Sequence, residues 1–104
     1  MGRLKSALGC LIIATATGCG SQIPTLKEWA DQNVGRPVAE LQAMDRSPRS
    51  YASRIGWLEQ TYTLPNGHWV YVHPDRRHCE LHFEVDPGGM IVSYRPVGEG
   101  CEHQ

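Results

Sequence analysis

The sequence predicts a small α+β domain, with one or two short N-terminal helices packed on a three- to four-stranded antiparallel meander and one disulfide. Apolar residues first recur at helical spacing, within residues 25–44. Short alternating segments separated by turn residues follow within residues 57–96. Helices followed by consecutive strands are typical of an antiparallel sheet that has one face covered by the helices.

The first helix is expected from about Thr25 to Asn33. Thr25 and Glu28 match a capping box, in which a hydroxyl and a carboxylate each accept a hydrogen bond from a free backbone N–H. Leu26 and Trp29 follow at helical spacing, so this helix has an apolar face to bury.

A second short helix is expected to begin at Pro37, because proline is favoured in the first turn of a helix. Its buried face would hold Val38, Leu41 and either Ala43 or Met44. Residues 45–56 are rich in Ser, Arg and Pro and are predicted to form a loop, with Tyr51 as a plug into the core.

Strands are predicted over residues 57–64, 68–73, 78–85 and 90–96. Asn66-Gly67 is a hairpin signal between the first two, and further turns are predicted at residues 74–77 and 86–89. The third strand alternates cleanly between apolar and polar residues. Its inward face is expected to hold Cys79, Leu81, Phe83 and Val85.

The second predicted strand presents two apolar faces. Val70 and Val72 are the expected core face, which would turn Trp69 and Tyr71 outward. Exposed Trp and Tyr side chains favour partner binding, so Trp69, Tyr71 and the nearby Arg77 are predicted to form a contact surface for a protein. The alternative is that both aromatic rings pack beneath another element, such as the preceding loop.

The N-terminus has the order of an export signal. Arg3 and Lys5 precede an uncharged apolar run, residues 8–14, and small residues then lead to Gly18-Cys19. This run is too short to span a bilayer as a stable helix. Gly18-Cys19 resembles the lipobox of bacterial lipoproteins, although Ala16 stands where that motif usually has Leu. A plain secretory signal and an anchored apolar helix are the alternatives.

The lipoprotein resemblance implies that residues 1–18 are removed and that the Cys19 thiol carries the lipid. Residues 19–24 would then be a short tether to a single domain, residues 25–104. In Gram-negative lipoproteins an Asp after the lipidated cysteine marks retention in the inner membrane. Gly20 stands at this place, so the resemblance implies a protein anchored in the outer membrane and facing the periplasm.

The cysteine count fits an oxidising compartment. Cys10 would leave with the signal and Cys19 would be blocked by lipid, which leaves Cys79 and Cys101 as an even pair. A disulfide between these two is therefore predicted. A metal site that uses both thiols is disfavoured, because neither cysteine belongs to a Cys-x-x-Cys pair.

The charge balance argues against nucleic-acid binding. Removal of residues 1–18 takes away two of 10 basic residues and none of 11 acidic residues, which leaves a net charge of −3. Beyond Arg76-Arg77 the remaining chain has no basic tract.

The segment Asn33-Val34-Gly35-Arg36-Pro37, the Asn66-Gly67 hairpin and the strand that ends in Val85 together resemble the SmpA/OmlA (BamE-like) outer-membrane lipoproteins. The resemblance extends over most of the mature domain. It implies a similar fold and location, and a role in the assembly or maintenance of the outer membrane. It transfers no functional residue of that family to this chain.

Catalysis and cofactors are not predicted. The serines lack a Gly-x-Ser-x-Gly context, and the paired carboxylates Glu80 and Glu84 lie on an open sheet face. A weak metal site formed by His73, Glu80 and His82 is one alternative, although a solvated polar face is the simpler interpretation.

The favoured function is thus a non-enzymatic envelope lipoprotein, anchored through Cys19, that binds an envelope protein. Two alternatives belong to other classes. The Pro65-Asn66-Gly67 tip could insert into the cleft of an extracellular hydrolase and inhibit it, or the histidines could bind a periplasmic metal.

Overall fold

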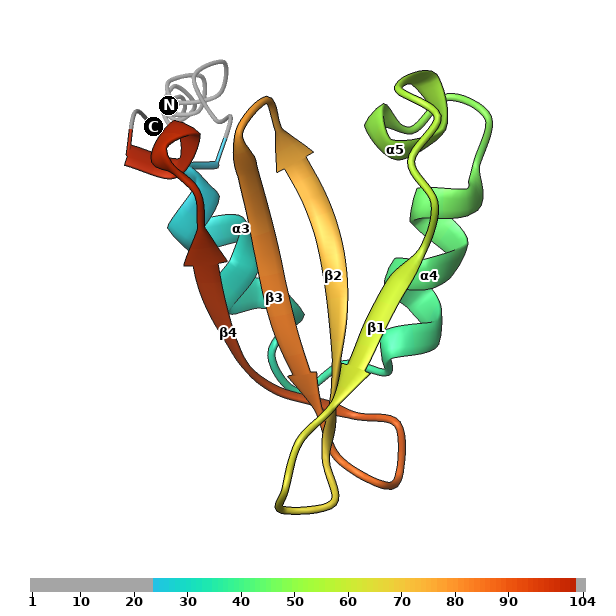
Figure 1. Cartoon of the computed structure of the whole chain (residues 1–104), viewed down its shortest axis with the longest axis vertical. Coiled ribbons are helices and arrows are strands. Elements are labelled where there is room, and N and C mark those ends of the chain that lie inside the picture. The colour runs from blue at the N-terminus through green and yellow to red at the C-terminus, as the bar shows by residue number, and fades with distance from the viewer. Residues whose placement is uncertain (1–23, 103–104) are drawn as a thin grey trace, which may run out of the picture.

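The computed structural model describes residues 24–102, and Figure 1 shows the arrangement of their elements. Within this part of the chain three helices come first: α3 (Leu26–Asn33), α4 (Val38–Arg46) and α5 (Tyr51–Arg54). The strands are β1 (Gln60–Thr63), β2 (Trp69–Arg76), β3 (Cys79–Val85) and β4 (Ile91–Val97), followed by the 3-10 turn η3 (Glu99–Glu102). The predicted signal, Cys19 and tether residues 20–23 lie outside the described residues.

The four strands form one antiparallel sheet in the order β1-β2-β3-β4, so the predicted meander is confirmed. Its inner face carries one core cluster that includes Leu26 and Ala30 of α3, Val38 and Leu41 of α4, and Phe83 of β3. The predicted α+β class, with N-terminal helices packed on the sheet, is therefore confirmed. Among residues 24–102 no helix has the length and hydropathy that a membrane span requires.

Helix α3 begins as the sequence predicts. The Thr25 hydroxyl accepts a 3.1 Å hydrogen bond from the Glu28 N–H, and the Glu28 carboxylate accepts one of 3.0 Å from the Thr25 N–H. This capping box satisfies two backbone donors that the helix itself leaves unpaired. Leu26 and Ala30 are buried on the sheet side, and Trp29 packs at the edge of the core.

Helix α4 follows Pro37 and buries Val38 and Leu41, as predicted, but its third buried position is neither Ala43 nor Met44. Met44 is 43% exposed, whereas Asp45 is only 6% exposed. The helix is therefore rotated so that the carboxylate meets hydrogen-bond donors of β2. A hydrophobicity pattern cannot predict this, because it assigns charged residues to the solvent side.

The predicted loop over residues 45–56 is only partly a loop. Helix α4 continues through Arg46, and the short helix α5 starts after Ser50, whose hydroxyl accepts a 3.0 Å hydrogen bond from the Ser53 N–H. Ala52 is the buried residue of α5, and Tyr51 is only partly buried, so the predicted tyrosine plug was wrong.

The strands differ from prediction at their ends. β1 is shorter than the predicted segment, and β2 continues through the residues expected to turn, so the actual turn lies at Arg77 and His78. His78 takes the left-handed conformation there, with φ of 60°. The predicted Asn66-Gly67 hairpin is present: Leu64 N–H donates to the His68 carbonyl at 2.9 Å, and Gly67 has φ of 89°.

The register of β2 against β3 reverses the predicted faces of β2. Tyr71 lies opposite Phe83, and antiparallel partners project to the same side of a sheet. Tyr71 is 1% exposed within the inner core, and Trp69 packs against the same core. Val70 and Val72 lie on the outer face, where they are nevertheless buried. The prediction that Trp69 and Tyr71 point outward was therefore wrong.

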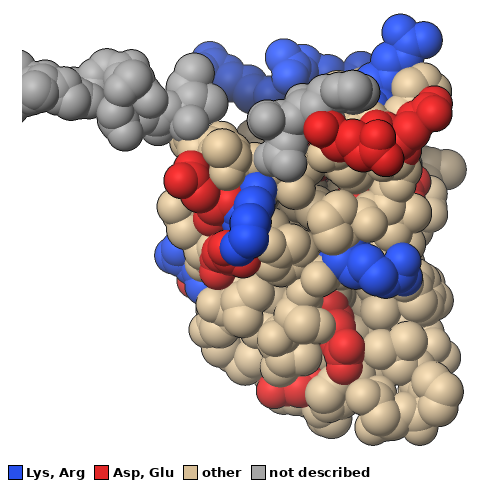
Figure 2. All heavy atoms as spheres, turned by 90° about the vertical axis from the view of Figure 1, so that its left-hand side faces the viewer, with Lys and Arg blue, Asp and Glu red and all other residues tan. Residues whose placement is uncertain are grey.

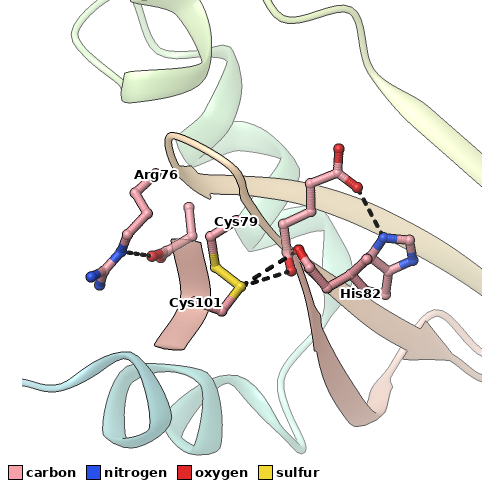
Figure 3. Close-up of a disulfide and its surroundings, with 7 residues drawn as sticks. Arg76, Cys79, His82 and Cys101 are labelled. Carbon is pink, nitrogen blue, oxygen red and sulfur yellow. Dashed lines mark hydrogen bonds and ion pairs between the residues drawn. A yellow bond between two sulfur atoms is a disulfide. The ribbon is translucent and has the colours of Figure 1, made fainter. Parts of the chain in front are cut away.

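The predicted disulfide is present (Figure 3). Cys79 at the start of β3 is bonded to Cys101 of η3, with a Cα–Cα distance of 4.9 Å. The C-terminal segment approaches the β2–β3 turn so closely that a Cβ atom at Gly100 would lie 2.2 Å from the Arg77 carbonyl oxygen. The Gly100 N–H also donates a 2.8 Å hydrogen bond to the His78 carbonyl. Covalent and backbone contacts thus hold η3 on the sheet.

Candidate functional site

A large groove lies between α5, the segment after it, and the β2–β3 turn. Its volume is about 580 Å³. Apolar side chains contribute much of its lining: Tyr51, Ile55, Trp57, Pro74 and Val97. Arg76, Arg77 and His78 line it from the turn, and Glu80 and Glu99 also reach it. An apolar groove bordered by charged side chains of both signs is suited to hold part of another molecule.

Arginine side chains are concentrated at the end of the domain that holds this groove. Figure 2 shows Lys and Arg side chains along the upper rim, which in Figure 1 is the end with α5 and the β2–β3 turn. Arg76 forms a 3.0 Å ion pair with Asp75, and Arg77 donates to the His78 ring at 3.3 Å. Of the predicted contact residues, Arg77 is therefore the one that lies exposed on the groove.

Trp57 lines both this groove and a smaller pocket of about 240 Å³ that Asp45, Glu59 and Tyr71 help to line. Its Nε1–H is buried and has no hydrogen-bond partner among residues 24–102. A buried donor without an acceptor costs about 1–3 kcal/mol. The indole N–H is thus a polar group that residues 24–102 leave unsatisfied at a groove.

The small pocket borders a buried polar cluster that no sequence pattern predicted. One oxygen of Asp45 accepts 2.8 Å hydrogen bonds from the Tyr71 hydroxyl and from Nδ1–H of His73. Burial raises the pKa of the Tyr71 hydroxyl, and the hydrogen bond to Asp45 raises it further, so Tyr71 stays protonated. The Trp29 ring lies against His73 with ring centroids 4.9 Å apart. This cluster joins α3, α4 and β2 across the core.

The outer face of the sheet carries a second polar network. The His82 ring donates from Nε2–H to Glu80 at 3.0 Å, so its Nδ1 accepts from the Tyr62 hydroxyl at 2.8 Å. Arg95 in turn donates to the Tyr62 oxygen at 3.4 Å. These side chains cover this face, where Val72 is only 2% exposed. The polar face predicted for β3 is present, and here it seals apolar residues of β2.

The structure separates the three residues considered as metal ligands. His73 faces the inner core, whereas Glu80 and His82 project from the outer face, so the three cannot share one ion. Both ring nitrogens of His82 are already hydrogen-bonded. Residues 24–102 hold no other grouping of three His, Cys, Asp or Glu side chains suited to a metal. The metal-site hypothesis was therefore wrong in its geometry.

Exposed apolar side chains gather in a segment that the sequence did not single out. Ile55 is 48% exposed, Leu58 81% and Tyr62 39%. They lie within eight residues that run from the end of α5 into β1. Ile55 also lines the groove, whereas Tyr62 lines a second pocket on the outer face of the sheet. The run Ile55-Gly56-Trp57-Leu58 could have signalled this segment, because its apolar residues neither alternate nor follow helical spacing.

Comparison of the chain with protein-family models, with curated proteins and with solved structures gives no match in any of the three. The arrangement described above offers apolar contact area and hydrogen-bond donors. Its function is therefore inferred from its own sequence and geometry.

Proposed function

We propose that this protein is a lipid-anchored, non-enzymatic component of the bacterial outer membrane that faces the periplasm and binds an envelope protein there. The observation that carries the proposal is the set of exposed apolar side chains within residues 55–62, of which Ile55 also lines the groove that Arg76 and Arg77 border. Exposed apolar patches that polar residues surround often mark sites of protein–protein interaction. A role in assembly or maintenance of the outer membrane follows from the resemblance noted for the sequence.

Two features support the location. The Cys79–Cys101 disulfide is stable in an oxidising compartment such as the periplasm. The Gly18-Cys19 motif supplies an anchor, and six tether residues, 19–24, reach at most about 20 Å when fully extended. The described chain begins at the same end of the domain as α5 and the β2–β3 turn (Figure 1). The groove would therefore be held near the membrane surface.

The anchor is tested by metabolic labelling of the full chain with an alkyne-tagged palmitate. We expect label in the membrane fraction and its loss in Cys19→Ser. Cys10→Ser is the matched control, because Cys10 precedes the expected cleavage site and should not affect labelling. Label that survives in Cys19→Ser would refute the lipoprotein assignment.

The binding role is tested by a photo-crosslinking residue placed at Arg77, on the wall of the groove. In intact envelopes we expect it to capture one discrete protein. The same residue placed at Arg36, an exposed position in the loop between α3 and α4 that does not line the groove, should not capture it. Equal capture at both positions would argue against a specific partner in the groove.

A hydrolase inhibitor is the second candidate, favoured by the position of the β1–β2 hairpin. The tip lies at the opposite end of the domain from the start of the described chain (Figure 1). The Asn66 side chain accepts a 2.9 Å hydrogen bond from the His68 N–H and stiffens the tip. Inhibition of an extracellular hydrolase that disappears in Asn66→Lys would favour this function; no inhibition by the purified domain would exclude it.

A further inference from the structure

Strand β1 leaves part of its backbone without a partner inside the sheet. The Leu64–His68 pair is hydrogen-bonded, and the register places Thr63 opposite Trp69 and Thr61 opposite Tyr71. In an antiparallel pair, hydrogen-bonded and non-hydrogen-bonded positions alternate. The backbone N–H and C=O groups of Thr61 and Thr63 therefore point away from β2. Within residues 24–102 no further strand lies on that side.

The two edges of the sheet are not equally protected. Natural proteins block an edge with charges, proline or a bulge, because an open edge invites another strand. β4 contains Arg95 and Pro96, and a register irregularity accompanies its pairing with β3. The Tyr94 hydroxyl also ties β4 to α3 through Asp31 at 2.8 Å. β1 reads Gln-Thr-Tyr-Thr, without charge, proline or bulge, and all four residues are exposed.

The side chains around β1 form two rows that a new strand would meet. Leu58 lies just before the strand and is 81% exposed. Tyr62, four residues later, projects from the outer face and is 39% exposed. On the inner side Arg46 of α4 holds Glu59 in an ion pair of 3.0 Å. An added strand would thus find apolar contacts on the outer face and polar groups on the inner face. This alternation matches the side-chain period of an extended chain.

We propose that the free edge of β1 is the docking site of an extended segment of the partner protein, which adds a strand to the sheet. The inference rests on the proposed binding function and names the kind of partner. Backbone hydrogen bonds to Thr61 and Thr63 supply affinity, and an apolar side chain beside Leu58 and Tyr62 supplies specificity. The segment alternates apolar and polar residues, with its polar side chains toward Arg46 and Glu59.

A second copy of this chain is a poor occupant of the same edge. Antiparallel pairing of β1 with another β1 requires a two-fold axis across the strands. The strands run along the long axis of the domain, and the described chain starts at one end of that axis (Figure 1). Such a dimer would carry its two N-terminal ends at opposite poles, so both copies could not be anchored through Cys19 in one membrane.

The test compares two crosslinking positions in the full chain in its native envelope. A photo-crosslinking residue at Leu58 reports on the β1 edge, and the same residue at Arg77 reports on the groove. We expect the Leu58 position to capture one envelope protein, joined within an extended segment. Amide hydrogen exchange of the complex should then show slowed exchange at Thr61 and Thr63 relative to the free protein.

The matched variants are Thr61→Pro and Thr61→Val. Proline removes the outward N–H, whereas Gln60 and Tyr62 keep the hydrogen bonds to β2. Loss of one backbone hydrogen bond together with the clash of the proline ring should lower capture at least about tenfold. Valine keeps the N–H and should leave capture unchanged. Thr63→Pro repeats the test if Thr61→Pro proves too unstable, as judged by exchange at Tyr62.

The outcomes separate the two proposals. Capture from Leu58 that Thr61→Pro abolishes and Thr61→Val retains supports strand addition. Capture from Arg77 that survives Thr61→Pro overturns strand addition and leaves the binding function in place. A crosslinked homodimer would overturn the proposal of a partner protein and would identify a second copy of this chain as the occupant of the edge. If neither position captures a protein, the proposed binding function itself fails.

Discussion

The Tyr71 hydroxyl of β2 donates a 2.8 Å hydrogen bond to the Asp45 carboxylate of α4, and both residues are buried. The bond joins two residues that are 26 positions apart in the sequence. The same carboxylate accepts from His73 at 2.8 Å. One oxygen therefore satisfies two buried donors, which makes Asp45 the residue on which the position of α4 against the sheet depends.

Asp45→Ala should lower the free energy of unfolding by about 3 kcal/mol, because it leaves two buried donors without an acceptor. Tyr71→Phe should cost only about 1 kcal/mol, since Asp45 keeps its bond to His73. Urea denaturation of the two single variants and the double variant measures the coupling. Costs that simply add would show that the Asp45–Tyr71 bond contributes nothing specific.

Gly100→Ala tests the packing of η3 on the β2–β3 turn. The new methyl group would lie 2.2 Å from the Arg77 carbonyl oxygen, so backbone must shift. We expect a loss of about 1–3 kcal/mol, as for other overpacked sites. Gly88→Ala is the control, because its methyl group would meet only the Asp86 side chain at 3.4 Å. The midpoint of thermal unfolding should fall for Gly100→Ala only. Equal midpoints for the two variants would show that η3 moves to accommodate the methyl group without loss of stability.

The Glu84 carboxylate predicts a pH effect in the acid range. Hydrogen bonds, first from His68 at 2.6 Å and then from Asn66, hold the pKa of Glu84 below its ordinary value. The unfolded chain therefore binds this proton at a higher pH than the folded chain does. The stabilisation is present above the ordinary glutamate pKa and is lost as pH falls through the lower folded value.

We expect this loss to be smaller in Glu84→Gln and also in His68→Leu, which removes the main hydrogen bond. The check is the free energy of unfolding by urea measured between neutral and acid pH. Parallel curves for the three proteins would show that the His68–Glu84 contact does not contribute to acid stability.

A buried residue of β2 and an exposed residue before β1 should respond differently to substitution. Tyr71→Ala removes a side chain that is 1% exposed and should cost about 3–5 kcal/mol. Leu58→Ser alters a side chain that is 81% exposed and should change stability by less than about 0.5 kcal/mol. Circular dichroism with denaturant measures both. A stable Tyr71→Ala variant would contradict the inner-face placement of this ring.

Local signals in the sequence were enough for several features. The Thr25–Glu28 capping box, the Asn66-Gly67 hairpin and the inward face of β3 each depend on residues close together in the chain, and all were predicted correctly. The Cys79–Cys101 pairing was predicted as well, because only this pair remains once the expected signal and lipidated cysteine are set aside.

Tertiary structure alone decided which face of β2 enters the core. Val70 with Val72, and Trp69 with Tyr71, are both apolar rows, and a period-two pattern cannot rank them. The pairing of Tyr71 with Phe83 makes that choice, and it also brings His73 beside Asp45. The free edge of β1 could not be predicted from the sequence either, because the strand order decides which strand has unpaired backbone groups. The sequence determined helices α3 and α4, the four strands and the disulfide, because these depend on local patterns and on the cysteine count. Packing between distant segments determined the buried polar cluster and the exposed edge.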